Sequence, residues 1–281
     1  MLAGFLLCTI SGSHMKKILI TGASSGIGLA LAHKYAINFA HQNLVLGLVG
    51  RKLNILKQVA QELESKYNAT CVIYALDVRD GAALNEAALD FIARFGAPNI
   101  VIASAGVSRG TLTEHQEDIA AFQAIMDINV MGMVKTFSPF VTAMQEAPLT
   151  EQTQLVGIAS VAGVRGLPGA GAYSASKAAA ITYLESLRVE MRTYGIDVTT
   201  VAPGYIRTPM TGINEYKMSF LMGADVFAKK CIAAIEKKRR FIIIPWQMGW
   251  VARLMRFIPP ALWDRIMRKA PHKERTEWDW L

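Results

Sequence analysis

Short apolar runs rich in β-branched residues alternate along the chain with longer stretches whose apolar residues recur at helical spacing. The short runs predict strands and the longer stretches predict helices. Strands that alternate with helices predict an α/β fold, a three-layer, doubly wound parallel sheet of about seven strands with helices on both faces. The predicted strands are 16–21, 44–49, 71–76, 99–103, 154–159, 197–201 and 241–244. The predicted helices are 29–39, 52–67, 81–95, 117–146, a stretch containing Tyr173 that ends near 194, and 225–238.

These elements predict one dehydrogenase-sized domain over residues 15–244. Residues 12–15 read Gly-Ser-His-Met, which is typical of a cloning scar, so residues 1–14 are interpreted as a leader from an expression vector. A membrane-targeting leader is the alternative. Residues 245–281 form a basic, Trp-rich, amphipathic C-terminal extension. No charge-free apolar run reaches the roughly 18 residues that would predict a transmembrane helix.

The net charge of +8 is confined to one end of the chain. From Lys229 onward there are thirteen Lys and Arg against five Asp and Glu, and the preceding residues contain seventeen of each. A neutral main body argues against a nucleic-acid-binding platform. The three cysteines, Cys8, Cys71 and Cys231, are widely spaced and form no metal-type pair. They predict incidental thiols in a reducing, cytoplasmic setting and no metal site.

A glycine-rich turn joins the first strand to the first helix. Residues 22–28 read Gly-Ala-Ser-Ser-Gly-Ile-Gly, with G-x-x-x-G-x-G spacing. Such a turn lets backbone approach a pyrophosphate, which the N-terminus of the following helix then attracts. The turn therefore predicts a dinucleotide site.

The second strand ends in Arg51 and Lys52, where NAD-binding folds carry an acidic residue for the ribose 2′-hydroxyl. No Asp or Glu occurs between Gly28 and Glu62. Because a guanidinium suits a 2′-phosphate, the sequence favours NADP(H) over NAD(H). The alternative is that Arg51 is only a solvated loop charge.

Tyr173 and Lys177 are four residues apart and share one face of a predicted helix. A nearby ammonium favours the phenolate and lowers the pKa of a phenol, so the pair is a candidate for proton transfer. An exposed helix pair is the alternative. The carboxyl ends of the predicted strands would bring further candidates to the same sheet edge, namely Gly22, Arg51, Asp77, Gly106, Ser160 and Pro203.

In combination these motifs resemble the classical short-chain dehydrogenase/reductase family over residues 16–244. The resemblance rests on Thr-Gly-Ala-Ser-Ser-Gly-Ile-Gly at 21–28, Asp77-Val78, Asn129, Ser160, Tyr173-x-x-x-Lys177 and Pro-Gly-Tyr-Ile-Arg-Thr at 203–208. It implies a Rossmann-like fold and an NAD(P)-dependent carbonyl/alcohol reaction.

The resemblance also implies roles for four catalytic residues. Tyr173 would be the general acid/base, and Lys177 would lower its pKa and bond the nicotinamide ribose. Ser160 would bond the substrate oxygen, and Asn129 would hold a helix kink and a water of a proton relay. Alternatively, Ser160 is a turn residue, Asn129 bends or caps a helix and Asp77 caps the next helix.

By the same resemblance Asp77 would meet the adenine, and Ile206 and Thr208 would meet the nicotinamide carboxamide. The expected cofactor-binding residues are Gly22, Ser24, Ser25, Gly26, Ile27, Gly28, Arg51, Lys52, Asp77, Val78, Ala105, Gly106, Tyr173, Lys177, Pro203, Gly204, Ile206 and Thr208.

One motif departs from the family pattern. The family's Asn-Asn-Ala-Gly after the fourth strand is Ala-Ser-Ala-Gly at residues 103–106. The asparagines brace that turn in the family, and the Ser104 hydroxyl could supply some of their hydrogen bonds but not all.

Residues 210–223 align with the family's substrate lid and contain several methionines, which predicts an apolar or amphiphilic carbonyl substrate. All five tryptophans follow, at 246, 250, 263, 278 and 280. Residues 248–258 and 261–269 predict two amphipathic helices interrupted by Pro259 and Pro260. Their basic and Trp-rich composition suits peripheral contact with an anionic membrane. Packing on the parent domain or a second subunit, as a roof over the substrate pocket, is the alternative.

The sequence thus predicts an NADP(H)-dependent oxidoreductase for a small carbonyl/alcohol pair. The alternative is a non-catalytic nucleotide-sensing or membrane-associated interaction protein on the same fold. A sugar epimerase is disfavoured, because such relatives have a larger C-terminal substrate domain than the residues after Thr208 provide. The resemblance also implies a homodimer or homotetramer formed through the helices that carry Asn129 and Tyr173.

Overall fold

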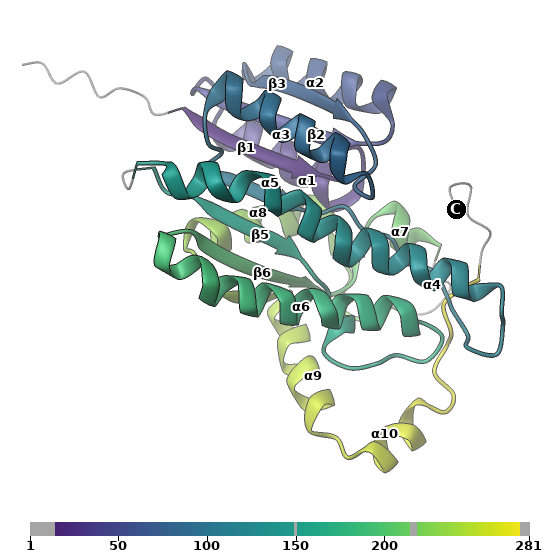
Figure 1. Ribbon diagram of the computed structural model, residues 1–281. Coiled ribbons are helices and arrows are strands. Elements are labelled where there is room, and N and C mark those ends of the chain that lie inside the picture. Colours follow the sequence, from purple (N-terminus) through teal and green to yellow (C-terminus); the bar gives the residue numbers. More distant parts are fainter. Residues whose placement is uncertain (1–14, 149–150, 214–217, 276–281) are drawn as a thin grey trace, which may run out of the picture.

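The computed structural model describes residues 15–148, 151–213 and 218–275. A seven-stranded parallel sheet forms its centre, in the order β3-β2-β1-β4-β5-β6-β9 (Figure 1). The strands are β1 Lys16–Thr21, β2 Leu44–Gly50, β3 Thr70–Ala75, β4 Ile100–Ala103, β5 Gln154–Ile158, β6 Asp197–Pro203 and β9 Phe241–Ile244. The main helices are α1 Gly26–Asn38, α2 Leu53–Tyr67, α3 Gly81–Phe95, α4 Asp118–Met126, α5 Gly132–Glu146, α6 Gly171–Met191 and α8 Ala224–Glu236.

Two apolar cores lie on opposite faces of the sheet and confirm the predicted three layers. Successive strand residues alternate between them, so that Ile18 and Ile20 face one core while Leu19 faces the other. Helices α1, α2 and α8 cover the first face, and α3, α5 and α6 cover the second. The order of the strands reverses between β1 and β4, which places the ligand-binding crevice of a doubly wound sheet at their carboxyl ends.

The predicted helix over 117–146 is interrupted. A π-helical segment, Asp127–Met131, separates α4 from α5 and carries Asn129. The apolar periodicity continues across the segment, so the pattern alone could not reveal it. Two short strands, β7 Ile206–Arg207 and β8 Met222–Gly223, and the single-turn helix α7 Pro209–Gly212 were not predicted, because elements this short carry no periodic signal.

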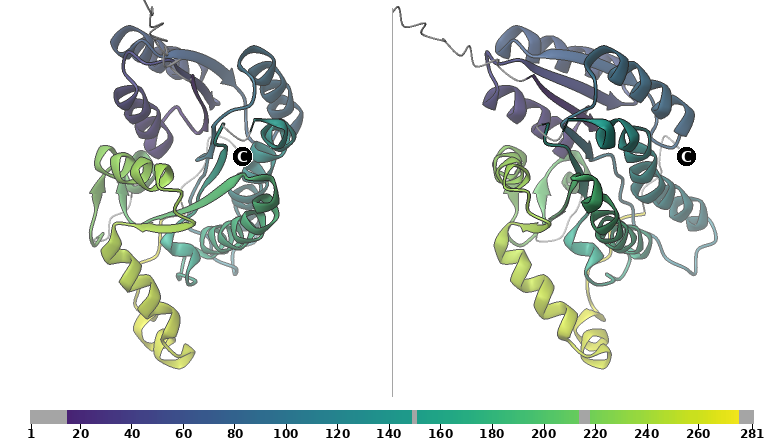
Figure 2. Two further views of the ribbon diagram at one scale, coloured as in Figure 1. Left: turned by 90° about the vertical axis from the view of Figure 1, so that its left-hand side faces the viewer. Right: turned by 60° about the vertical axis from the view of Figure 1, so that its left-hand side comes forward.

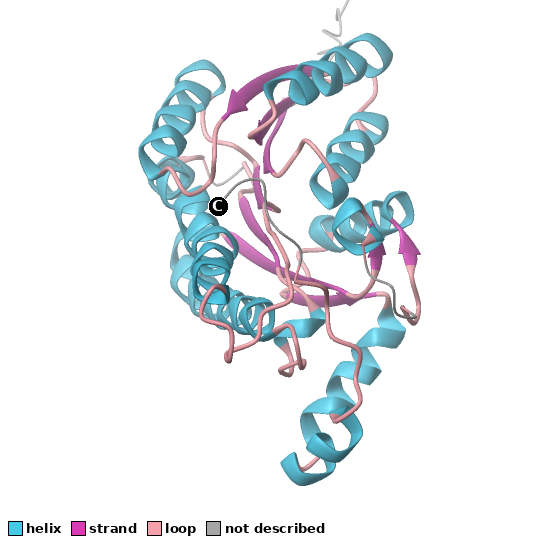
Figure 3. Cartoon of the chain, turned by 90° about the vertical axis from the view of Figure 1, so that its right-hand side faces the viewer, coloured by secondary structure: helices cyan, strands magenta, loops and turns pink. Residues whose placement is uncertain are grey.

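The C-terminal extension forms helices α9 Trp246–Phe257 and α10 Pro260–Met267, close to the predicted pair. Both project from one side of the domain (Figure 2). The segment that follows α10 is a loop that returns towards α4 (Figures 1 and 3). The leader at 1–14 and the tryptophans at 278 and 280 fall outside the described residues. No helix within 15–148, 151–213 and 218–275 is long and apolar enough to cross a membrane.

Candidate active site

The glycine-rich turn is shaped by close backbone packing. Gly22 has a φ of +71°, and a Cβ there would lie 3.0 Å from the Cα of Ala105. A Cβ on Gly28 would overlap the Gly22 carbonyl oxygen. Ser25 precedes α1 without a side-chain cap, so the first N–H groups of α1 lack a cap from that residue. The turn therefore has the form that accepts a pyrophosphate.

Thr21, at the end of β1, stabilises the turn that follows β4. Its Oγ1 accepts hydrogen bonds from the backbone N–H groups of Ser104 (3.1 Å) and Ala105 (3.2 Å). The buried Ser104 Oγ has no hydrogen-bond partner among the described residues. The expectation that the Ser104 hydroxyl replaces part of the asparagine bonding is therefore wrong, and a threonine from the neighbouring strand does this instead.

Asn129 fixes the loop that continues from that turn. Its Oδ1 accepts from the Val107 N–H (2.8 Å), and its Nδ2 donates to the Val107 carbonyl (2.9 Å) and to Ser176 Oγ (2.9 Å). The side chain is fully buried. A residue in the π-helical segment thereby ties the β4 loop to α6, the helix that carries Tyr173 and Lys177.

Lys177 and Tyr173 lie close together, with the Lys177 Nζ 5.8 Å from the centre of the Tyr173 ring. The Lys177 Nζ donates to the Ile158 carbonyl at 2.9 Å. Burial lowers the pKa of Lys177 to about 8, which remains compatible with a cation at neutral pH.

Ser160, just after β5, forms a hydrogen bond with the Tyr173 side chain. Burial raises the pKa of Tyr173, and this hydrogen bond acts in the opposite direction without reversing the shift. The expected lowering of the Tyr173 pKa by Lys177 does not appear in this structure: burial of the phenol dominates, and the contribution that opposes it comes from Ser160.

Two neighbouring cavities follow the carboxyl edge of the sheet. One, of 160 Å³, contains Ser160, Tyr173 and Lys177, and the other, of 110 Å³, contains Arg51 and Asp77. Gly22, Ser25, Ala105 and Gly106 line both. The remaining predicted residues that line one of the two are Ser24, Gly26, Ile27, Gly28, Val78, Pro203, Gly204, Ile206 and Thr208.

Two predicted residues line neither cavity. Lys52 is exposed at the N-terminal boundary of α2, and Asn129 lies behind the β4 loop.

Asp77 and Arg51 lie at the far end of the smaller cavity. Asp77 accepts hydrogen bonds from the Arg79 backbone and guanidinium, including Nη2 at 2.9 Å. Burial alone would raise the pKa of Asp77, but Arg79 and the nearby charge of Arg51 outweigh it and lower the pKa. The cap of α3 is Asp80, which accepts from the Ala83 N–H at 3.0 Å, so the alternative role of Asp77 as a helix cap is wrong.

This edge has the features that a dinucleotide needs. A Cβ on Gly106 would lie 3.2 Å from Asn129 Oδ1 and 3.5 Å from Lys177 Nζ, so a side chain at this position would press on two of the predicted catalytic residues. The Ser104 hydroxyl is buried without a partner among the described residues, and Ser104 belongs to the wall of the larger cavity. Within the described ranges, no cluster of three or more His, Cys, Asp or Glu is placed to hold a metal ion. Burial raises the pKa of Cys71 and of Cys231 to about 12, which leaves both as unreactive thiols.

A sequence model described as short chain dehydrogenase matches residues 16–218 of this chain. The chain belongs to the short chain dehydrogenase family. An uncharacterized oxidoreductase of Myxococcus xanthus is 34% identical over 251 residues, which cover 89% of this chain and 96% of that protein. The bovine dehydrogenase/reductase SDR family member 7B is 29% identical over 92% of this chain and 82% of its own.

Solved structures share the fold of this short chain dehydrogenase. A Burkholderia phymatum short chain dehydrogenase/reductase in complex with NAD has a TM-score of 0.76 at 24% identity, covering 96% of this chain and 99% of its own. A Sphingobium yanoikuyae short-chain dehydrogenase in complex with NADPH has a TM-score of 0.72 at 23% identity, covering 88% and 98%. The chain is therefore an oxidoreductase of a class whose structures bind NAD or NADP.

Sequence reasoning missed a further contributor to this dehydrogenase site. The loop after α10 brings Lys273 close to Tyr173, with its Nζ 2.9 Å from Ser108 Oγ and 6.0 Å from the centre of the Tyr173 ring. The sequence shows basic residues in this segment, but no spacing relates them to a site more than 90 positions earlier. Only the return of the loop brings them together.

Proposed function

We propose that this short chain dehydrogenase is an NADP(H)-dependent oxidoreductase that interconverts a carbonyl and an alcohol, with Tyr173 as the acid/base. The observation that carries this proposal is the gathering of Ser160, Tyr173 and Lys177 around one cavity beside the glycine-rich turn. In the reductive direction Ser160 and Tyr173 would donate hydrogen bonds to the substrate oxygen, where negative charge develops. Tyr173 would then transfer its proton to that oxygen.

The other residues support this transfer. Lys177 would stabilise the phenolate that remains on Tyr173 and would bond the nicotinamide ribose. Asn129 would hold the β4 loop and a water that returns the proton. The nicotinamide cofactor supplies the hydride when bound. The glycine-rich turn would contact the cofactor.

The preference for NADP(H) rests on Arg51. Its charge reaches Asp77, at the end of the cleft where the adenosine ribose of a dinucleotide would lie. A guanidinium there would pair with the 2′-phosphate of NADP(H), and Lys52 would add a weaker long-range attraction. Relatives of this fold have been solved with either nucleotide, so the preference has to be measured.

Titration of NADPH and NADH by tryptophan and nicotinamide fluorescence tests this function. We expect NADPH to bind at least tenfold more tightly, a difference of about 1.4 kcal/mol. Arg51→Asp should abolish this difference, whereas Lys57→Asp, an exposed charge reversal on α2, should leave it intact. Binding of NADPH without reduction of any carbonyl compound would favour the non-catalytic nucleotide-sensing protein, and absence of binding would reject the site.

The substrate would be apolar or amphiphilic. Met210 lines the larger cavity beside Thr208, and Phe220 and Leu221 are exposed on the lid segment nearby. Part of that segment, 214–217, lies outside the described residues. The relevant screen compares carbonyl compounds of increasing chain length, and kcat/KM that does not rise with length would contradict this preference.

A homodimer or homotetramer would form through α4, α5 and α6. Exposed apolar side chains on these helices support this assembly, notably Ile119 and Phe122 on α4 and Val189 on α6. Sedimentation velocity should show a dimer or tetramer, and Ile119→Glu should dissociate it. A monomer at micromolar concentration would exclude this assembly.

The protein would be cytoplasmic, with peripheral membrane contact through α9 and α10. Trp250, Leu254 and Phe257 are 63%, 67% and 83% exposed, which leaves an apolar face without cover among the described residues. Arginines on the same helices complement an anionic surface. Sedimentation with phosphatidylserine vesicles should fall for Trp250→Ser with Phe257→Ser but not for Leu89→Ser, which changes an exposed apolar residue of α3. Equal binding by both variants would reject this contact.

A further inference from the structure

The C-terminal loop packs against the loop after β4 and the segment before α6, beside Tyr173. The Gly110 N–H donates to the Glu274 carbonyl at 2.9 Å. A Cβ on Gly110 would overlap the Lys273 carbonyl oxygen, and a Cβ on Gly169 would lie 2.7 Å from His272. Two glycines, one in the loop after β4 and one before α6, thus leave the recess in which the C-terminal loop lies.

Charged contacts hold this loop beyond Lys273. The Arg275 Nε donates to Asp118 Oδ2 at 2.8 Å, and its Nη2 donates to Glu117 at 2.8 Å. Asp118 is buried and also pairs with Arg109 at 3.6 Å. A buried carboxylate at the start of α4 therefore anchors the end of the C-terminal loop.

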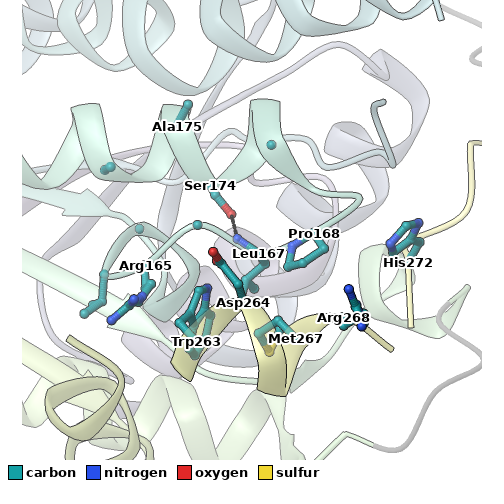
Figure 4. Close-up of a pocket in the computed structure, with 15 residues that line it drawn as sticks. Arg165, Leu167, Pro168, Ser174, Ala175, Trp263, Asp264, Met267, Arg268 and His272 are labelled. Atoms are coloured by element: carbon teal, nitrogen blue, oxygen red, sulfur yellow. Dashed lines mark hydrogen bonds between the residues drawn. The ribbon is translucent and has the colours of Figure 1, made fainter. Parts of the chain in front are cut away.

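A second anchor holds α9 and α10. Arg165, in the loop that follows Ser160, donates from Nη1 to the Met255 and Ile258 carbonyls at the end of α9. Its guanidinium lies 4.5 Å from the centre of the Trp263 ring (Figure 4). A groove of 730 Å³ remains between this loop and α10.

Between these anchors Lys273 is held over the acid/base residue. Its Nζ donates to Ser108 Oγ and faces the Tyr173 ring, whereas Lys177 contacts the same ring from within the cleft. Burial lowers the pKa of Lys273 to about 8. Among the described residues no carboxylate pairs with Lys273, although its neighbour Arg275 has two. Within the part of the chain that the structure describes, this partly buried cation beside Tyr173 therefore has no carboxylate partner.

We propose that Lys273 binds an anionic oxygen group of the substrate, so that the protein prefers carbonyl compounds that carry a carboxylate or a similar anion over their neutral analogues. This inference rests on the proposed function, because the bound group would belong to the molecule whose carbonyl meets Tyr173. It refines the amphiphilic substrate inferred above: the apolar part would face the lid segment, and the anion would face the C-terminal loop. Lys273 is a specificity-determining residue in this proposal, not an acid or base.

The test compares 4-formylbenzoate with its methyl ester. The ratio of kcat/KM for the acid to kcat/KM for the ester is measured in each protein. Relative to wild type, this ratio should fall by about tenfold to a hundredfold in Lys273→Met, mainly because the KM of the acid rises. Lys273→Arg should restore most of the ratio. Lys269→Met removes an exposed lysine from the same segment and should keep the wild-type ratio.

Calorimetric titration of the NADPH-saturated protein with octanoate and octanamide provides a readout without turnover. Octanoate should bind more tightly, and Lys273→Met should lose that difference. An equal loss of kcat/KM for acid and ester, or of affinity for octanoate and octanamide, would mean that Lys273 only holds the C-terminal loop in place. Either result would overturn the proposal. Unchanged ratios would overturn it as well. Failure to bind NADPH or to reduce either aldehyde would instead reject the proposed function itself.

Discussion

Helices α6 and α9 place their side chains in opposite ways. Helix α6 buries Leu184 and Met191 in the core, together with the polar residues Ser176 and Lys177. Helix α9 buries only Met248 and Ala252 and leaves its large apolar side chains exposed. The first helix is held by packing, whereas the extension is held by arginines that bind backbone carbonyls and carboxylates.

Mutations in the two regions should therefore have different effects. Changes in α6 should alter chemistry and global stability together, because its polar residues sit inside the core. Changes in the contacts of the extension should alter the cleft mouth while the sheet remains folded, because few core contacts cross to α9 and α10.

The largest effect is expected for Tyr173→Phe. Losing the hydroxyl of the proposed acid/base should reduce kcat by about a thousandfold, while NADPH affinity stays nearly constant. Tyr183→Phe alters a tyrosine on the same helix, outside the cavities, and should retain activity. Stopped-flow and steady-state reduction assays measure both variants. Activity retained in Tyr173→Phe would contradict the proposed role of Tyr173 as the acid/base.

Lys177→Met should abolish turnover and yet stabilise the protein at pH 7. The pKa of Lys177 falls to about 8 in the folded state, against the ordinary 10.5, so the unfolded chain binds the proton more tightly. Wild-type stability should therefore rise between pH 8 and 10.5, and removing the cation should gain up to about 3 kcal/mol at pH 7.

Urea denaturation at pH 7 and pH 10.5 measures this gain. The stability of the variant should lack the rise that comes from this group, so the two proteins should converge at high pH. A loss of stability at pH 7 would show that the hydrogen bond to the Ile158 carbonyl outweighs burial of the charge.

Arg275→Met should release the C-terminal loop without unfolding the domain. We expect trypsin to cleave after Arg268 and Lys269 about tenfold faster, with little change in the free energy of unfolding, because Arg109 still pairs with Asp118. Arg265→Met removes an exposed arginine of α10 and serves as the control. Mass spectrometry of the digest identifies the cut sites. Unchanged cleavage would mean that α9 and Arg165 suffice to hold the segment.

Gly110→Ala should have the smallest effect on global stability, because its effect should be confined to the C-terminal loop. The added Cβ overlaps the Lys273 carbonyl, so the C-terminal loop must shift while the sheet is untouched. Gly171→Ala, where nothing lies within 4 Å of the added Cβ, is the matched control. Thermal unfolding should change by less than about 1 kcal/mol in both variants. Only Gly110→Ala should reduce the acid-to-ester ratio of kcat/KM. An unaltered ratio would mean that the position of the C-terminal loop against Gly110 does not affect substrate preference.

The periodicity of the chain was sufficient for the sheet and for most of its helices. Each long element has a repeating apolar pattern, and strand ends in a parallel sheet meet at one edge, so residues as distant as Gly22 and Thr208 could be placed together in advance. The hydrogen bond from the Ser104 N–H to Thr21 Oγ1 could not be predicted in the same way, because the two residues are brought together only by the pairing of β1 with β4.

The sequence by itself determined the doubly wound fold, the sheet edge at which the predicted site residues gather and the family, because these depend on local periodicity and on motifs at strand ends. The tertiary structure decided the direction in which the pKa of Tyr173 shifts, since desolvation depends on everything packed around the ring. It also decided the position of Lys273, because a loop without periodicity is placed only by the glycines and carboxylates that receive it.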